Sequence, residues 1–131
     1  MLPNMPGHFP QSAVYQKALE IFTISSSISR YMMDDLNAIK KDGSEDPNIY
    51  FTGDIVQQSV SLGPEILLAE AQPFAEEKRK HVDSVTRLTN LLYKNCERLE
   101  RANSRGKEFL PVLRHELKKF RKLQRSWMLT L

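Results

Sequence analysis

Apolar and small residues recur with a helical period in four stretches of this 131-residue chain. In the first stretch they are spaced by three or four residues, which places them on one face of an α-helix. This face consists of Val14, Ala18, Ile21, Ser25, Ile28, Met32, Leu36 and Ile39. We therefore expect a long amphipathic helix that begins near Ser12 and ends near Asp42-Gly43.

A second helical period follows residues 43–47, a segment of turn-forming residues that ends in proline. This helix is expected to begin at about Thr52. Its inner face consists of Ile55, Ser59, Leu62, Ile66 and Ala69. Gly63-Pro64 interrupts the helix, because proline removes one intrahelical hydrogen bond and clashes with the preceding turn. The apolar period continues past the proline, so we expect a kink rather than a break.

Two further helices are expected, one before and one after residues 103–106. The third begins at the Gln72-Pro73 turn, and Pro73 suits its first turn. Its inner face consists of Val82, Val85, Leu88, Leu92, Cys96 and Leu99. In the fourth helix Pro111 is tolerable in the first turn. The inner face of this helix consists of Leu110, Leu113, Leu117, Phe120, Gln124 and Trp127.

Four long helices with short connections predict an all-α fold, an antiparallel up-down-up-down four-helix bundle. No run alternates apolar and polar residues as a half-buried strand does. The first residues contain three prolines and a glycine, so residues 1–11 are expected to form a flexible leader. Residues 12–131 are then a single domain, and this length suffices for one hydrophobic core.

Charge is distributed unevenly along the chain. Residues 1–72 contain four Lys or Arg and nine Asp or Glu, a balance of −5, whereas residues 73–131 contain fifteen and seven, a balance of +8. In the last two helices the basic residues repeat at spacings of 7, 4, 3 and 4, which puts each set on one helix face. The two stripes are Arg87, Lys94, Arg98, Arg101 and Arg105, and Lys107, Arg114, Lys118, Arg121 and Arg125.

Two positive stripes on neighbouring helices favour a polyanionic partner such as RNA or DNA. Contacts to the phosphate backbone make binding sensitive to salt and weakly specific for sequence. The residues predicted to bind are Arg87, Lys94, Arg98, Arg101, Arg105, Arg114, Lys118, Arg121 and Arg125.

Two other interpretations of the charge pattern stay open. Asp83 with Arg87 and Glu97 with Arg101 have the spacing of intrahelical ion pairs, so part of the stripe is equally explained as a solvated, self-paired face. The acidic first half also permits head-to-tail assembly into a closed ring, in which it meets the basic half of a neighbouring subunit. Its acidic cluster consists of Asp34, Asp35, Asp42, Glu45 and Asp46.

Two segments carry a resemblance to a known family. Residues 14–21, Val-Tyr-Gln-Lys-Ala-Leu-Glu-Ile, and residues 51–66, which begin Phe-Thr-Gly-Asp-Ile, resemble four-helix-bundle proteins encoded in intervening sequences of bacterial large-subunit ribosomal RNA. Relatives of that family include the accessory variability proteins of diversity-generating retroelements. Where the family has paired arginines this chain has Val56 and Gln57, and the family's proline is displaced by one residue to Pro64.

The resemblance implies a four-helix protomer that often assembles into a ring-like homopentamer. In the retroelement branch it implies a basic assembly that binds nucleic acid and a reverse transcriptase. It implies no enzymatic activity.

The sequence contains no pattern typical of a catalytic, cofactor or metal site. His8, His81 and His115 are far apart, and Glu76, Glu77 and His81 do not form the Glu-x-x-His repeats of di-iron bundles. Residues 115–119, His-Glu-Leu-Lys-Lys, are similar to the core motif of histidine phosphotransfer bundles, although Lys119 replaces the small residue which that site needs. Phosphotransfer is therefore a distant alternative, and otherwise His115 is expected to be an exposed helix residue.

The chain lacks the features of exported and membrane-inserted proteins, so we expect a soluble protein of the cytoplasm that binds no membrane. The single cysteine, Cys96, lies on the apolar face of its helix and is expected to act as a small hydrophobic residue in a reducing compartment. The apolar C-terminus suggests a subunit contact, made by Trp127, Met128, Leu129 and Leu131.

These patterns together predict a non-enzymatic, nucleic-acid-binding, oligomeric accessory factor. The alternative is a protein-binding adaptor that docks to a partner of the reverse-transcriptase type.

Overall fold

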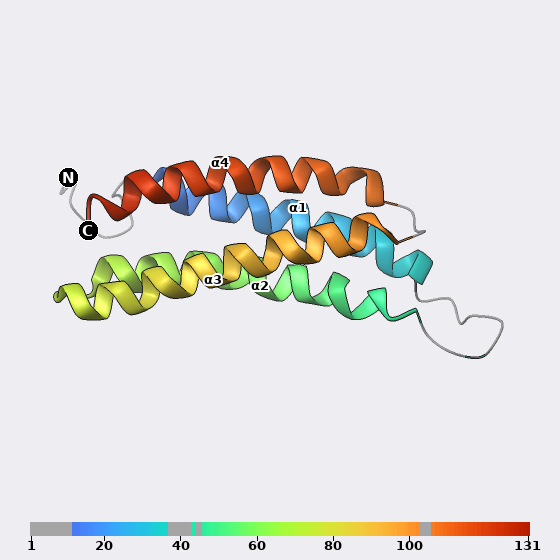
Figure 1. Ribbon diagram of the computed structural model, residues 1–131, viewed down its shortest axis with the longest axis horizontal. Helices are drawn as coiled ribbons and strands as arrows, with labels where there is room; N and C mark the ends of the chain where they lie inside the picture. The colour runs from blue at the N-terminus through green and yellow to red at the C-terminus, as the bar shows by residue number, and fades with distance from the viewer. Residues whose placement is uncertain (1–11, 37–42, 44–45, 103–105) are drawn as a thin grey trace, which may run out of the picture.

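The computed structural model describes residues 12–36, 43, 46–102 and 106–131. Its elements are the helices α1 (Ala13–Leu36), α2 (Asn48–Ala71), α3 (Ala75–Glu100) and α4 (Leu110–Met128), with a short 3₁₀ helix, η2 (Lys107–Phe109), before α4 (Figure 1). No strand occurs within the described ranges. The prediction of an all-α fold with four long helices is therefore confirmed.

The four long helices pack side by side as a helical bundle. Contacts join α1 to α2 and to α4, and they join α3 to the same two helices. In Figure 1 the helices lie along the long axis of the molecule, and the connection from α2 to α3 lies at the opposite end from the connection between α3 and α4. Each helix thus presents one face to the interior and another to solvent.

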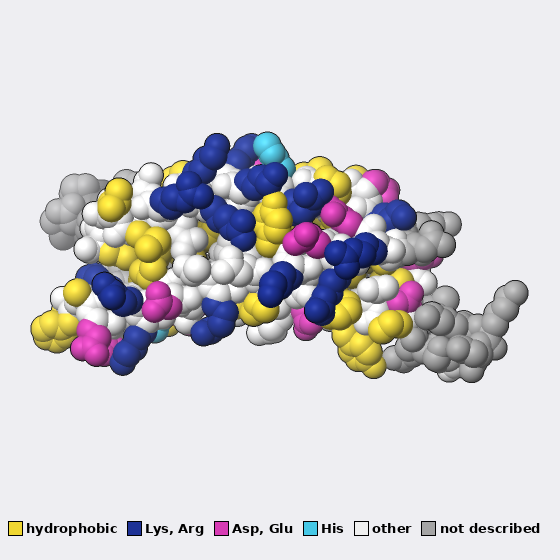
Figure 2. Space-filling view, viewed as in Figure 1, with side chains coloured by type: hydrophobic (Ala, Val, Ile, Leu, Met, Phe, Trp, Pro, Cys, Tyr) yellow, Lys and Arg dark blue, Asp and Glu magenta, His cyan; other side chains and the backbone are white. Residues whose placement is uncertain are grey.

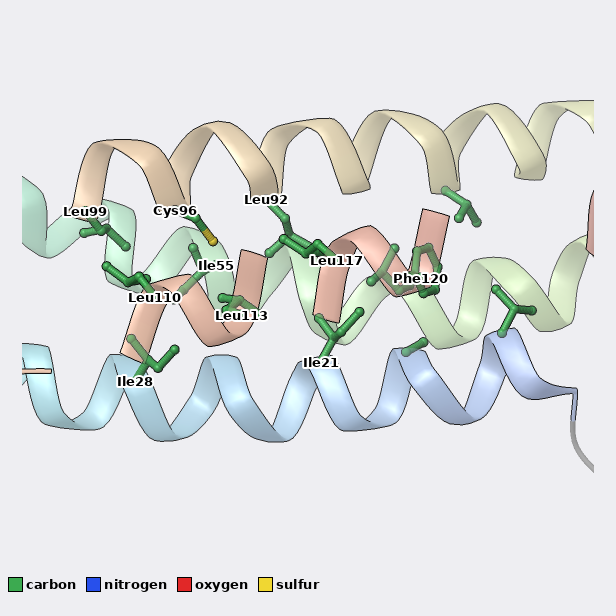
Figure 3. Packing of buried hydrophobic residues seen from close by; sticks show 14 of the residues in the cluster. Ile21, Ile28, Ile55, Leu92, Cys96, Leu99, Leu110, Leu113, Leu117 and Phe120 are labelled. Atoms are coloured by element: carbon green, nitrogen blue, oxygen red, sulfur yellow. The ribbon is translucent and has the colours of Figure 1, made fainter. Parts of the chain in front are cut away.

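The interior is built from the apolar faces that the periodicity predicts. Nearly all of the expected inner residues are buried; Leu88 is half-buried and Ile39 lies outside the described residues. Figure 3 shows residues of all four helices pointing toward one another in this core. Those labelled there are Ile21, Ile28, Ile55, Leu92, Cys96, Leu99, Leu110, Leu113, Leu117 and Phe120.

Side-chain hydrogen bonds stabilise the beginnings of α1 and α2. The backbone N–H of Tyr15 donates to Ser12 Oγ at 3.3 Å, which stabilises the first turn of α1 near the expected start. Helix α2 begins at Asn48, four residues earlier than predicted. Asp46 Oδ1 accepts hydrogen bonds from the backbone N–H and the side-chain amide of Asn48 at 2.9 and 3.0 Å, and this turn starts the helix ahead of Thr52.

Three prolines occupy different positions relative to the helices. Helix α2 continues from Asn48 to Ala71 with Pro64 inside it, so the helix is not broken there, as expected. Pro73, in contrast, was expected in the first turn of α3, and that prediction is wrong. Phe74 has extended backbone angles (φ −111°, ψ 142°), so α3 begins only at Ala75 and Pro73 belongs to the connection. Pro111 lies in the first turn of α4, as predicted.

Gly106 joins the end of α3 to η2 with a left-handed backbone, at φ +88°. A Cβ atom at this position would lie 3.0 Å from Tyr31 Cβ and 3.4 Å from Met32 Cγ of α1. At Gly106 the chain is therefore both left-handed and closely packed against α1, which suits a residue without a side chain.

The end of α4 is partly buried. Trp127 is only 6% exposed, and its Nε1–H donates to Glu70 Oε2 of α2 at 3.0 Å. Trp127 therefore belongs to the core of its own bundle, as the apolar stripe predicts, and not to an exposed contact surface. The residues beyond it, Met128, Leu129 and Leu131, are exposed.

Candidate nucleic-acid interface

The structure places the predicted basic residues along the outer surface of α3 and α4. Arg114 and Arg121 are half-buried, and Arg105 lies outside the described residues. The exposed members are Arg87, Lys94, Arg98, Arg101, Lys118 and Arg125. Figure 2 shows Lys and Arg side chains gathered over α3 and α4 on one face of the molecule.

A groove of about 200 Å³ separates α3 from α4 on this face. Arg121 and Arg125 line it from α4, and Thr86, Thr89 and Asn90 are among the residues that line it from α3. Arg121 Nη2 donates to Asn90 Oδ1 at 3.0 Å, which holds the guanidinium against α3. The groove therefore carries two positive charges, those of Arg121 and Arg125.

A second hollow, of about 430 Å³, lies on α3 beside this groove. Arg87 and Lys94 line it, together with one acid, Asp83. Because Thr86 and Asn90 line both hollows, the two share an edge. Basic side chains of both helices thus surround one continuous surface, which we call the central basic surface, made of Arg87, Lys94, Arg121 and Arg125.

Arg114 has a different role. Its Nε–H donates to Glu100 Oε1 at 2.6 Å, and both side chains are partly shielded from solvent. This hydrogen bond raises the pKa of Arg114 above its ordinary value. The charge of Arg114 is therefore paired with an acid of α3, and the residue joins two helices rather than standing free for a phosphate.

Two of the predicted arginines lie over aromatic rings. The guanidinium carbon of Arg98 is 4.8 Å from the centroid of the Phe51 ring, and that of Arg121 is 4.5 Å from the centroid of the Tyr93 ring. Both rings are half-buried. Sequence reasoning missed these rings because Phe51 and Arg98 lie 47 positions apart in the chain and meet only when α2 packs against α3.

The intrahelical pairs of the alternative interpretation do not form on α3. Within the described residues, neither Asp83 with Arg87 nor Glu97 with Arg101 comes within ion-pair distance. Arg87 Nη2 instead lies 3.5 Å from Ser84 Oγ, at the limit of a hydrogen bond. Self-pairing thus does not neutralise this part of the stripe.

The acidic cluster of the first half is partly described. Asp34 and Asp35 are exposed near the end of α1, and Asp46 contributes to the turn before α2. Asp42 and Glu45 lie outside the described residues. At the positions of the family's paired arginines, Val56 packs against the core and Gln57 is exposed.

The histidines and the cysteine of the described residues form no metal-binding cluster. His115 is exposed, and the neighbouring Lys119 forms an ion pair with Glu116 at 3.3 Å. His81 Nδ1 lies 2.7 Å from Glu65 Oε2. Cys96 is buried, as expected, and burial raises the pKa of its thiol to about 12. A search of the described residues finds no group of three or more His, Cys, Asp or Glu that could hold a metal ion.

No protein-family model matches the chain, and the searches of curated proteins and of solved structures give no significant match. None of the helices, over the residues described, has both the length and the apolar character needed to cross a membrane.

Proposed function

We propose that this chain is a non-enzymatic protein that binds RNA or DNA through basic residues of α3 and α4 and acts as an oligomeric accessory factor. The observation that carries the proposal is the central basic surface, where four cationic side chains of two helices surround adjoining hollows lined by one acid. Phosphates are the groups that such a surface attracts most strongly, because they are anionic and accept hydrogen bonds. The exposed cations Arg98, Arg101 and Lys118 extend the positive surface beyond it.

Binding to short labelled RNA and DNA, measured across a salt series, tests this proposal. The test variant carries Lys94→Glu and Arg125→Glu, which reverse two charges of the central basic surface. The control carries Arg30→Glu and Lys119→Glu, which reverse two exposed charges outside the predicted stripes, one on α1 and one on the side of α4 that carries Glu116. Both variants change the formal net charge from +3 to −1, so they differ only in where the charge is lost.

We expect the wild-type protein to bind with an affinity that falls steeply as salt rises. The test variant should reduce the salt slope by about two, one for each phosphate contact removed. The control should keep most of the wild-type affinity. Equal losses in both variants would show that net charge alone governs binding, and no binding at low salt would refute the proposed function.

We also propose the antiparallel up-down-up-down arrangement for the bundle and a ring-like homo-oligomer for the assembly. The contacts of each helix with the next in the chain, and of α1 with α4, support the arrangement, as do connections at opposite ends in Figure 1. Charge complementarity between exposed acids such as Asp34 and the basic surface of a neighbour supports head-to-tail assembly. The pentamer and the reverse-transcriptase partner are proposed from the family resemblance. The cytoplasmic location is proposed because the chain has a single cysteine and so forms no intramolecular disulfide.

A protein-binding adaptor is the second candidate function, and exposed apolar side chains favour it. Phe74 and Leu129 are 70% and 90% exposed, and Met128 and Leu131 line a hollow of about 490 Å³ between the start of α3 and the end of α4. Exposed apolar groups at one end of a bundle suit contact with another protein or another subunit. The adaptor predicts a defined protein complex and no affinity for nucleic acid, so the salt series above separates the two functions.

A further inference from the structure

Two arginines on the basic face are held over aromatic rings, and this arrangement suits a particular form of nucleic acid. Arg98 of α3 lies over Phe51 of α2, and Arg121 of α4 lies over Tyr93 of α3. A guanidinium is planar and delocalised, so it can stack on a ring with one side and on another flat group with the other. Each pair therefore forms a small platform, and we call them the two arginine platforms.

The platforms lie on either side of Lys94. One joins α2 to α3 and the other joins α3 to α4, so they flank the exposed surface of α3 on which Lys94 stands. Tyr93 and Arg98 are five residues apart, which corresponds to about 7.5 Å of rise along a helix. Across this face the planar guanidinium of Arg98 comes first, the flexible ammonium group of Lys94 follows, and the planar guanidinium of Arg121 comes last.

Contacts with the protein restrict the guanidinium of Arg121 before any ligand binds. The Tyr93 ring lies against it, and its Nη2 donates to Asn90 Oδ1 at 3.0 Å. A side chain that is already held in place loses less conformational entropy on binding than a freely moving one. Binding a phosphate does not require a planar cation that is held in place, because a mobile lysine attracts a phosphate equally well as a point charge.

Flat groups recognise the faces of bases. Unpaired bases expose these faces and stack on aromatic rings or on arginine planes, whereas bases inside a duplex are stacked on one another. We propose that the basic surface selects single-stranded nucleic acid, with bases stacked on Arg98 and Arg121 and phosphates held by Lys94 and Arg125. This inference rests on the nucleic-acid-binding function proposed above and specifies its ligand.

Replacing the planar cations without changing the charge tests the inference. The platform variant carries Arg98→Lys and Arg121→Lys, which keep both charges and remove both guanidinium planes. The matched control carries Arg30→Lys and Arg79→Lys, the same chemical change at two exposed arginines outside the proposed binding surface, for which the structure describes no aromatic ring beneath. Circular dichroism and thermal unfolding check that both variants fold as the wild type does.

Binding is measured by fluorescence anisotropy with one mixed-sequence labelled strand, alone and annealed to its complement, as RNA and as DNA. We expect the platform variant to bind the single strand about thirtyfold more weakly, because it loses two stacking contacts. Duplex binding should be unchanged in that variant, and both affinities should be unchanged in the control. A loss with single strands of RNA, of DNA or of both supports the inference and identifies which sugar the surface accepts.

An equal loss for single strand and duplex, or no loss in the platform variant, would overturn the inference. A wild-type protein that binds duplex more tightly than single strand at the same salt concentration would also overturn it. These results leave the proposed function intact, because the protein still binds nucleic acid. Absence of binding to every form at low salt is a different outcome and refutes the proposed function itself.

Discussion

Replacing Gly106 by alanine tests whether a left-handed turn determines how α4 enters the bundle. Gly106 is buried and has φ +88°, a conformation that residues with a Cβ atom rarely adopt. The added Cβ would lie 3.0 Å from Tyr31 Cβ and 3.4 Å from Met32 Cγ. Because Tyr31 Cβ is bonded directly to the backbone of α1, rotating the tyrosine side chain does not relieve this contact.

Two effects lower the free energy of unfolding of the Gly106→Ala protein. A left-handed backbone costs an L-residue such as alanine about 1 kcal/mol or more relative to glycine. Relief of the close contact requires a shift between α1 and the turn, and overpacking of this kind costs about 1–2 kcal/mol further. We therefore expect Gly106→Ala to lower the free energy of unfolding by about 2–3 kcal/mol. For a domain of this size the thermal midpoint should fall by roughly 5–15 °C.

Urea unfolding followed by circular dichroism measures the effect, and Gly53→Ala is the matched control. Gly53 lies on the exposed side of α2, and a Cβ there meets nothing within 4 Å. Alanine in a helix interior is favoured over glycine, so this control should raise the free energy of unfolding by about 0.5–1 kcal/mol. A Gly106→Ala protein as stable as the wild type, beside a stabilised Gly53→Ala protein, would refute the reasoning about the turn.

Two further predictions concern the core and the C-terminus. Burial raises the pKa of the Cys96 thiol from 9.0 to about 12, so the thiol ionises at lower pH in the unfolded protein than in the folded one. The stability that the buried thiol contributes is therefore complete below pH 9.0 and is lost progressively as pH rises toward 12. Urea unfolding of the wild type and of Cys96→Ala should show a stability difference that shrinks over this range, and a constant difference contradicts the account. Deletion of residues 129–131, which spares the buried Trp127, should lower the mass of the proposed assembly measured by light scattering, because it removes Leu129, which is 90% exposed. An unchanged mass with an intact circular dichroism spectrum excludes this end as a subunit contact.

The inner faces of the four helices could be predicted from the sequence, because burial of one face imposes a period of three and four residues. Phe120 and Gln124 illustrate how far this extends. The period predicts that both are buried, although one is apolar and the other polar. The structure adds that Gln124 Nε2 donates to Thr86 Oγ1 at 2.8 Å, which satisfies the buried amide.

Contacts between helices could not be predicted in the same way. A stripe tells which face of a helix a residue occupies, but not which residue of the next helix lies opposite. Arg114 and Lys118 share a stripe and the same expected role, yet Arg114 meets Glu100 while Lys118 is exposed. The starts of α2 and α3 could not be predicted for a related reason, because local contacts rather than the apolar period determine them. The side chain of Asp46 accepts a hydrogen bond before α2, and Phe74 has an extended backbone before α3.

The basic stripes of α3 and α4 therefore combine two physical roles that composition cannot separate. Arg114 lies partly shielded beside Glu100, and removing it would leave a carboxylate between two helices without its partner. Lys94 and Arg125 are exposed, and exposed charges contribute little to folding. Folding stability thus accounts for the presence of Arg114 but not for that of Lys94 and Arg125 on one surface. The exposed pair Lys94 and Arg125, which contributes little to the fold, therefore supports a polyanionic partner better than Arg114 does.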